Sequence, residues 1–321
     1  MKESTRVWIF VATALVIVGV IGFFVTMAKN KWNFKELDDT MFVTNNYDFD
    51  TTIEDITINT DTADLVFEKS TDGKAHISCY EDEKRLHNVA VSGSTLSVEV
   101  TDSRKWYEKF ATVSFKAPSI KIALPEAAYK ALVIKESTGE VKIPADFSFS
   151  SIDIKASTGN VQCYASTEGT LKIKLSTGGI TVEGVSAAAA NFETSTGSIT
   201  VKSLSCAGDM YVKVSTGKSR LSDITCASFT SEGTTGAITM ERLVASGKFK
   251  VKRSTGNVNL DKCDGAEVYI ETDTGNIKGS FASDKIVFAK SDTGRVDVPK
   301  STNGGSCELK SDTGHIIITI E

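Results

Sequence analysis

The sequence is short of the residues that usually build metal sites, disulfide frameworks and rigid loops. Its 321 residues include three histidines, four prolines and six cysteines, and no two cysteines form a CxxC pair. Without that spacing the sequence offers no zinc motif. The formal net charge of −5 at pH 7 lacks the surplus of Lys and Arg that phosphate neutralisation requires. Nucleic acid is therefore not an expected partner.

One stretch is apolar and long enough to cross a membrane. Residues 7–28 read VWIFVATALVIVGVIGFFVTMA without a charge, which at ~1.5 Å per residue spans the hydrocarbon core. We predict an N-terminal tail (1–6) and a retained transmembrane helix (7–28), because a cleaved signal usually has only ~7–15 apolar residues. Positive charge is similar on both sides, so charge does not orient the helix. We expect the following domain to be extracytoplasmic, because such a domain is exported regardless of loop charge.

A Thr-Gly pair recurs through the last part of the chain at a spacing of 19 or 20 residues. The positions two and four after each glycine, and five before it, are mostly apolar, while the position between the first two is polar in nine of ten copies. This alternation predicts two strands per unit, each with one buried face, and the fixed period predicts stacking of the units. The ten glycines are Gly139, Gly159, Gly178, Gly197, Gly217, Gly236, Gly256, Gly275, Gly294 and Gly314.

The predicted fold is an all-β, single-stranded β-solenoid of about ten two-strand rungs of 19–20 residues. Each rung consists of a strand, a Ser/Asp-Thr-Gly corner, a second strand and a return loop. Glycine supplies a corner conformation that a Cβ would resist. We therefore expect Gly217→Val or Gly256→Val to destabilise the fold by about 1–3 kcal/mol.

A charged residue lies four positions before every corner glycine. In chain order these are Lys135, Lys155, Lys174, Glu193, Lys213, Glu232, Lys252, Glu271, Lys290 and Lys310. The signs alternate from Lys174 to Lys290, so stacking in register would place opposite charges on neighbouring rungs. We interpret the row as a ladder that sets register, which makes Glu232→Lys costlier than Glu232→Gln at low salt. The alternative is a lysine-rich docking stripe for an anionic wall polymer.

The segments before the repeat are less regular. Strand-like stretches occur between residues 53 and 131 without a fixed period, and the terminal units of solenoids are commonly atypical. We predict a polar stalk over residues 29–52, an irregular β cap or degenerate rungs over 53–131, and solenoid repeats over 132–321.

The opening strands and two motifs, IALPEAAYKALVIKESTG (122–139) and CDGAEVYIETDTGNIKGS (263–280), resemble a known group of proteins. It is a bacterial family of β-strand-repeat proteins of unknown function, labelled "putative adhesins", with some members linked to envelope-stress operons of the Lia type. The resemblance covers most of the soluble part. It implies a β-solenoid, often membrane-anchored, without known catalytic residues.

Two groups of residues invite a chemical reading. Asp273, Asp292 and Asp312 each begin an Asp-Thr-Gly triplet, the signature of aspartic proteases, but that chemistry needs two carboxylates facing each other. Stacked corners would put them side by side, so we interpret them as turn residues, with weak Ca²⁺ binding as an alternative. Cys206 and Cys226 fall at equivalent positions of adjacent rungs, as buried thiols or as a disulfide. We assign no catalytic, cofactor-binding or metal-ligating residue.

The function predicted from these features is a non-enzymatic, membrane-anchored protein of the cell envelope, an adhesin or scaffold that contacts a wall polymer or an envelope protein. A second hypothesis is an accessory or sensory component of an envelope-stress system that acts through a membrane partner. A carbohydrate-active enzyme is the third, and it would need clustered carboxylates and aromatic side chains in a groove.

The chain ends in a strand-like segment, HIIITIE (315–321), that we expect to form the last rung. An uncovered strand edge pairs readily with another chain. We therefore predict self-association, or docking of a partner, through this C-terminal edge. Ile317 occupies an outward position that is polar in the other repeats, so Ile317→Lys is expected to block the contact.

Overall fold

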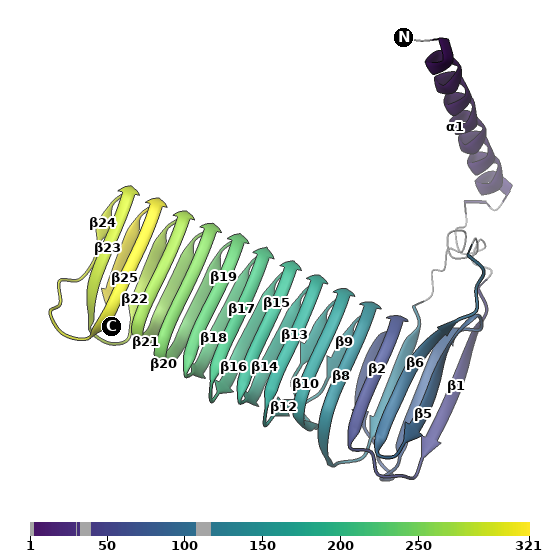
Figure 1. Ribbon diagram of the computed structural model, residues 1–321, viewed down its shortest axis with the longest axis horizontal. Helices are drawn as coiled ribbons and strands as arrows, with labels where there is room; N and C mark the ends of the chain where they lie inside the picture. The colour runs from purple at the N-terminus through teal and green to yellow at the C-terminus, as the bar shows by residue number, and fades with distance from the viewer. Residues whose placement is uncertain (1–2, 30, 33–39, 107–116) are drawn as a thin grey trace.

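The computed structural model describes residues 3–29, 31–32, 40–106 and 117–321. One apolar helix, α1 (Glu3–Lys29), precedes a long stack of strands, in which successive rungs lie side by side from one end to the other (Figure 1). The β-solenoid predicted from the repeat is confirmed. Its inward side chains form one continuous apolar core that runs the length of the stack.

Each rung contributes one strand to each of two rows. The first row contains the strands that lead into the corner glycines, and at the N-terminal end three strands that lead into no such glycine continue it. In spatial order it holds β5 (Arg85–Ser92), β6 (Thr95–Asp102), β2 (Asp55–Thr62), β8 (Ala128–Thr138), β10 (Ser148–Thr158), β13 (Thr170–Thr177), β15 (Ala189–Thr196), β17 (Asp209–Thr216), β19 (Ser228–Thr235), the second parts of β20 (Ile238–Thr255) and β21 (Val258–Thr274), β25 (Gly305–Thr313) and β23 (Lys285–Thr293).

The second row contains the strands that leave the corners, and three strands of the cap continue it at the N-terminal end. It holds β1 (Phe42–Phe49), β4 (Ala75–Asp82), β7 (Ser119–Leu124), β3 (Asp64–Lys69), β9 (Val141–Ile143), β11 (Val161–Cys163), β14 (Ile180–Ala187), β16 (Ile199–Cys206), β18 (Ser219–Cys226), the first parts of β20 and β21, β22 (Ile277–Phe281), β26 (Ile316–Ile320) and β24 (Val296–Asp297). A short strand, β12 (Ser166–Thr167), pairs with β10 in a return segment.

The corner glycines stack directly on one another. Gly217 has φ +142°, and a Cβ built there would lie 1.6 Å from the carbonyl oxygen of Gly197 in the rung before. Its amide donates a 2.8 Å hydrogen bond to the Thr235 carbonyl in the rung after. Both the backbone conformation and the rung spacing therefore require glycine at this position.

The N-terminal end of the stack is closed by antiparallel strands. β4 pairs with β7 and β5 pairs with β6, so the turn between β4 and β5 leads from one row to the other, and β1 pairs with the outer edge of β4. Residues 42–49 were predicted to belong to a polar stalk, and that prediction is wrong for them, because alternate side chains of β1 pack on the cap. Tyr47 and Phe49 contact the core from this strand. The predicted stalk residues 33–39 lie outside the described part of the chain.

The C-terminal end has an order that differs from the order of the sequence. The last rung in the chain, β25 and β26, lies between the rung of β21 and β22 and the rung of β23 and β24 (Figure 1). The prediction of an exposed C-terminal edge strand is therefore wrong. Ile317 pairs with Lys278 on one side and Asp297 on the other, so the outermost rung is the one that contains Gly294.

Two glycines allow the last rung to enter the stack. The segment that leads into β25 passes between the backbone of Ala266 and that of Asp284. A Cβ at Gly304 would lie 1.8 Å from the Asp284 carbonyl oxygen, and one at Gly305 would lie 2.4 Å from that of Ala266. Lys285, which is 2% exposed, holds the outer rung in place by contacting Asp264 and Ser283.

Candidate functional site

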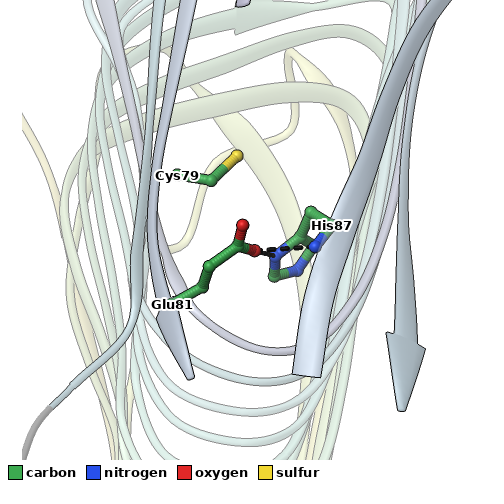
Figure 2. Close-up of side chains that lie close together, drawn as sticks. All are labelled: Cys79, Glu81 and His87. Carbon is green, nitrogen blue, oxygen red and sulfur yellow. Dashed lines mark hydrogen bonds and ion pairs between the residues drawn. The ribbon is translucent and has the colours of Figure 1, made fainter. Parts of the chain in front are cut away.

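Three buried polar side chains meet inside the N-terminal cap. Cys79 and Glu81 lie on β4, and His87 lies on β5, with all three side chains directed into the space between the strands (Figure 2). Cys79 is fully buried, and Glu81 and His87 are 1% and 3% exposed. A carboxylate and an imidazole in such a position must satisfy each other, because burial of an unpaired charge is costly.

The strand pattern explains why these residues meet. Alternate residues of β4 are buried, so Cys79 and Glu81 share the inward face with Ile77. The turn after β4 is fixed by Asp82, whose carboxylate accepts a 2.9 Å hydrogen bond from the Lys84 amide. β5 then returns antiparallel with His87 and Val89 inward. The turn from one row to the other therefore brings two residues spaced i, i+2 and one six residues further along into a cluster.

Hydrogen bonds fix the orientation of the carboxylate and the imidazole. Glu81 Oε2 accepts from the His87 amide at 2.7 Å and lies 2.6 Å from His87 Nδ1. Asn45 Nδ2 on β1 donates to Glu81 Oε1 at 2.7 Å. On the other side of the ring, His87 Nε2 lies 2.8 Å from Thr60 Oγ1 on β2. Four strands thus contribute to one network.

The remaining member of the cluster is a thiol. One ligand atom each from Cys79, Glu81 and His87 lie within 4.8 Å of one another. Burial, followed by the negative charge of Glu81, raises the pKa of the Cys79 thiol to about 12. The thiol is therefore protonated at neutral pH, which argues against a role as a free nucleophile.

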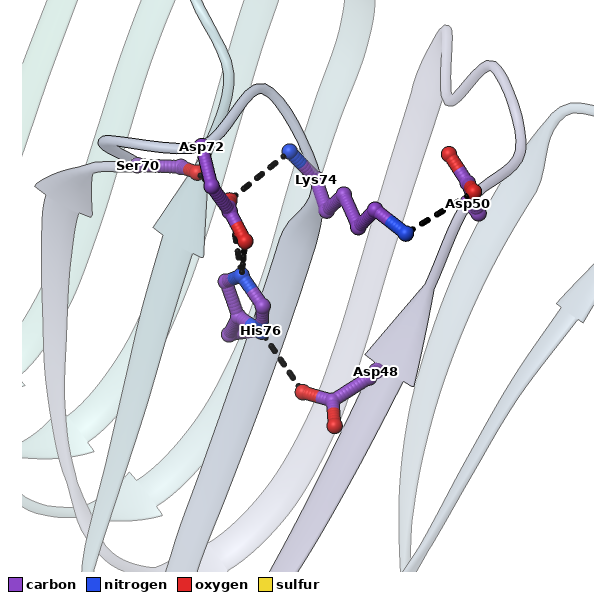
Figure 3. Close-up of polar contacts among 6 residues, drawn as sticks. All are labelled: Asp48, Asp50, Ser70, Asp72, Lys74 and His76. Carbon is purple, nitrogen blue, oxygen red and sulfur yellow. Dashed lines mark hydrogen bonds and ion pairs between the residues drawn. The ribbon is translucent and has the colours of Figure 1, made fainter.

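A second polar group lies on the surface of the same cap. His76 on β4 is placed between two carboxylates, with Nδ1 2.6 Å from Asp48 on β1 and Nε2 2.9 Å from Asp72 (Figure 3). Lys74 donates to Asp50 at 2.9 Å close by. Asp48 and then Asp72 raise the pKa of His76, and His76 lowers the pKa of Asp72. These contacts fasten β1, the first described strand after α1, to β4.

The cap and the first rungs match a known family. The model of the Toastrack DUF4097 family matches residues 53–217, which include the three buried cap residues and the first five corner glycines. This match covers more than half of the 321 residues. The chain belongs to the Toastrack DUF4097 family. Membership confirms the resemblance to β-strand-repeat proteins of unknown function, while no curated protein matches the chain.

Solved structures with similar folds cover most of the chain. A "putative adhesin" from Parabacteroides merdae ATCC 43184 is 17% identical with a TM-score of 0.50, covering 75% of this chain and 97% of its own. A "putative adhesin" from Parabacteroides distasonis ATCC 8503 is 15% identical with a TM-score of 0.49, covering 85% of this chain and 98% of its own. At such low identity the P. merdae structure supports the Toastrack fold and not a function.

The Asp-Thr-Gly triplets of this Toastrack chain lie at neighbouring corners. The register pairs Thr274 with Thr313 and Thr313 with Thr293, so the aspartates follow in the order Asp273, Asp312 and Asp292 along one edge. They are exposed and stand side by side. An aspartic-protease dyad needs two carboxylates that share a proton face to face, and this row has a different geometry.

The six cysteines are all buried and free. Cys206 and Cys226 occupy equivalent positions at the ends of β16 and β18, and burial raises the pKa of both thiols. Of the two alternatives, a disulfide or two buried thiols, the structure has two buried thiols. Burial next to main-chain carbonyls makes them core residues rather than reactive groups.

The charge ladder forms in register with one change of neighbour. Glu193 pairs with Lys174 and Lys213, and Glu232 pairs with Lys213 and Lys252. Because the last rung is inserted, Glu271 pairs with Lys252 and Lys310 rather than with Lys290. The alternation therefore runs from Lys174 to Lys310, and the predicted end of the ladder at Lys290 is wrong.

One buried charge in the repeat was not anticipated from the sequence. Arg253 is 4% exposed and points inward from β20. Its Nη2 donates to Ser231 Oγ at 2.8 Å, and its guanidinium fills the space that a side chain at Gly233 would take. Burial lowers the pKa of Arg253 to about 10. The signal was present in the sequence, because Ser231 replaces an apolar residue at an inward position of the neighbouring rung.

Proposed function

We propose that this chain is a non-enzymatic protein of the cell envelope, anchored in the membrane by α1, with the solenoid outside as a rigid adhesin or scaffold. The observation that carries the proposal is the helix itself. Thr5–Lys29 has a mean hydropathy of 2.7 over its most apolar window, and none of that window is buried against the solenoid. An apolar helix of 25 residues whose most apolar window is unburied has the length and composition to cross a bilayer.

The surface that best fits an envelope partner is a basic groove near the cap. Lys135, Lys155 and Lys174 lie on adjacent rungs in register, above a groove of about 380 Å³ that Ser137 and Ser157 also line. From Lys174 to Lys310 the ladder alternates in sign, and at the outer end only two lysines, Lys310 and Lys290, are neighbours. Three stacked lysines repel one another and lower the stability of the fold. An anionic polymer that runs along the stack would relieve this repulsion, so we propose a polyanionic glycan of the envelope as the ligand.

The topology can be tested in intact cells by cysteine labelling. The native cysteines are buried and should react little, so labelling of a single introduced, exposed cysteine can be detected. Ser254→Cys at an exposed corner is expected to react with a membrane-impermeant maleimide, whereas Thr5→Cys at the start of the helix is expected to react only after lysis. Labelling of Thr5→Cys but not Ser254→Cys in intact cells would overturn the proposed orientation. Release of the chain from membranes by salt alone would overturn the anchor.

The polymer contact has a matched control within the ladder. Polyphosphate is a suitable polyanion probe for the full-length protein in nanodiscs. Replacing Lys135, Lys155 and Lys174 together by Gln should weaken its binding by at least about tenfold at low salt. The control replaces Lys213, Lys252 and Lys310, which hold the same position in the alternating part of the ladder. Equal loss in both triple variants would show that net charge, and not the groove, binds the polymer.

A further inference from the structure

We propose that the cluster of Cys79, Glu81 and His87 is a metal-binding site for a divalent cation of the zinc type. The three residues offer a sulfur, a carboxylate oxygen and an imidazole nitrogen, the set of ligand types that zinc prefers in proteins. One such atom from each lies within 4.8 Å of the others. No other group of three His, Cys, Asp or Glu side chains comes this close among the residues that the structure describes.

The surroundings of the cluster orient the ligand atoms toward one another. Asn45 donates a hydrogen bond to Glu81 Oε1, and Thr60 is hydrogen-bonded to His87 Nε2. Glu81 Oε2 and His87 Nδ1 are therefore directed at each other beside the thiol (Figure 2). Metal-binding histidines usually have their second ring nitrogen fixed by such a partner. The proton between His87 Nδ1 and Glu81 Oε2 therefore lies where the cation would bind.

The exchange of protons for a cation balances. Without metal, His87 Nδ1–H donates to the carboxylate, and Thr60 donates to Nε2. With metal, Nδ1 binds the cation, the ring proton moves to Nε2, and Thr60 Oγ1 accepts it. Cys79 loses its proton to solvent, so the site releases one proton for each cation that it binds.

Charge favours the exchange inside the cap. A thiolate and a carboxylate together with a divalent cation make a neutral site, which is the state that a buried environment requires. Glu81 has no Lys or Arg partner among the described residues, so no side-chain cation already takes this role. Three protein ligands leave one position of a tetrahedral cation for a water molecule.

Cobalt provides a spectroscopic test on the full-length protein in detergent. Co²⁺ should bind once per chain and give visible d–d bands with a thiolate-to-cobalt charge-transfer band. Cys79→Ser should abolish the charge-transfer band, while Cys163→Ser, which alters another fully buried cysteine in β11, should leave it unchanged. Thr60→Val removes only the oxygen beside Nε2 and should weaken Co²⁺ binding about 10- to 100-fold.

Two measurements keep the proposal testable if the cap tolerates no substitution. X-ray absorption of the wild-type protein loaded with zinc should show one sulfur in the first coordination shell, and zinc should raise its melting temperature. The proposal is overturned if Co²⁺ gives no charge-transfer band in the wild-type protein, or if that band survives Cys79→Ser. Either result would make the cluster a hydrogen-bond network that only stabilises the cap.

Discussion

The two ends of the solenoid are closed in different ways. At the N-terminal end the parallel stack stops, and antiparallel strands β4, β5 and β1 cover it over a buried polar network. At the C-terminal end the parallel stack continues to the last strand, but the final rung of the chain lies inside it and the preceding rung lies outermost. One end changes the kind of pairing, and the other changes the order of the rungs.

The difference matters because an open stack exposes unpaired backbone groups and an apolar core. The cap buries a carboxylate and an imidazole that contact each other, Glu81 and His87, and so its closure depends on specific side chains. The outer rung is instead closed by partly buried apolar side chains and by charged residues. Val287 and Ala289 are only partly buried there, and charged residues such as Lys290 and Asp292 stand along its edge. We expect the cap to be the chemically specialised end and the outer rung to be the more easily opened one.

The largest effect should come from removing the inserted rung. Deletion of residues 305–321 takes away Cys307, Leu309, Ile316 and Ile318, each at most 3% exposed. Burial of four such side chains contributes on the order of 6 kcal/mol or more. The outer rung would also lose its neighbour. Hydrogen exchange should therefore become fast in β23 and faster in β21 and β22, while the cap keeps its protection.

A control substitution, Glu321→Gln, should leave exchange unchanged, because this side chain is exposed and the residue's amide keeps its hydrogen bond to the Phe281 carbonyl. If the 305–321 deletion left β23 protected, the outer rung would have to pair directly with β21. The inserted order would then not be needed to close this end.

The second largest effect concerns a buried acid where the cap meets the repeat. Glu136 on β8 is 6% exposed, and burial, followed by the charge of Asp64, raises its pKa to about 8. The folded state therefore holds a proton that the unfolded state releases above about 4.5. Stability should fall as the pH rises from about 4.5 to 8, by up to roughly 5 kcal/mol. Glu136→Gln should flatten this part of the melting profile, and an unchanged profile would contradict the assignment.

The sequence was sufficient for the repeat because its signals are local. Alternating burial and a glycine corner fix each rung from a few neighbouring residues. The order of the last rungs could not be predicted, because any rung of this type can stack on any other. The ladder did not help either, since Lys290 and Lys310 are equally good partners for Glu271. The one informative signal was the pair Gly304 and Gly305, which only a close backbone passage explains.

The cap site escaped prediction for a related reason. Cys79, Glu81 and His87 do not have the spacing of a zinc motif, and they come together because a turn leads from β4 in one row to β5 in the other. Alternation along AHISCYED and RLHNVAVS places each of them on an inward face, so the buried polar residues could have been noticed. Their mutual contact depends on β4 and β5 facing each other from opposite rows, β4 paired with β7 and β5 with β6, which the sequence pattern does not specify.

The third effect tests the close stacking of the corner glycines. Gly217→Ala places a Cβ against the Gly197 carbonyl oxygen at 1.6 Å, so it should cost about 3 kcal/mol. Gly184 also has a positive φ, but a Cβ there would have no neighbouring atom within 4 Å, so Gly184→Ala should cost only about 1 kcal/mol. Ala63, at the corner before Gly139, already carries a Cβ. Equal melting temperatures for the two variants would contradict stacking as the cause.

The fourth effect is a test of the ladder. Glu232 also accepts a hydrogen bond from Tyr211, so Glu193 is the cleaner position. Glu193→Lys should destabilise by about 1 kcal/mol more than Glu193→Gln, because it meets Lys174 and Lys213 on both sides. The difference in melting temperature should shrink in high salt. If the gap persists at high salt, packing rather than charge is responsible.

The smallest effect should appear at β1, on the surface of the cap. The carboxylates of Asp48 and Asp72 raise the pKa of His76, so the folded state binds the proton more tightly than the unfolded state. Their contribution is complete below about pH 6.5 and is lost as the pH rises through the raised value. Because the pKa of Asp72 is lowered, the contribution of Asp72 to stability changes only in acid and is constant over this pH range. Because His76 is exposed, screening by solvent keeps the effect small.

Hydrogen exchange of the β1 amides in the Glu136→Gln background isolates this effect from the buried acid. Exchange in this background should accelerate above neutral pH relative to the same protein that also carries His76→Gln, in which no charge at residue 76 titrates. Asp48→Asn should remove most of the difference, because Asp48 supplies the shorter of the two contacts at 2.6 Å. If β1 opens equally in all three proteins at every pH, its attachment depends on its ladder with β4 and on Tyr47, whose hydroxyl donates to the His87 carbonyl at 3.1 Å. In that case the cap would be closed by packing at its surface as well, and its ionisable groups would matter only in the interior.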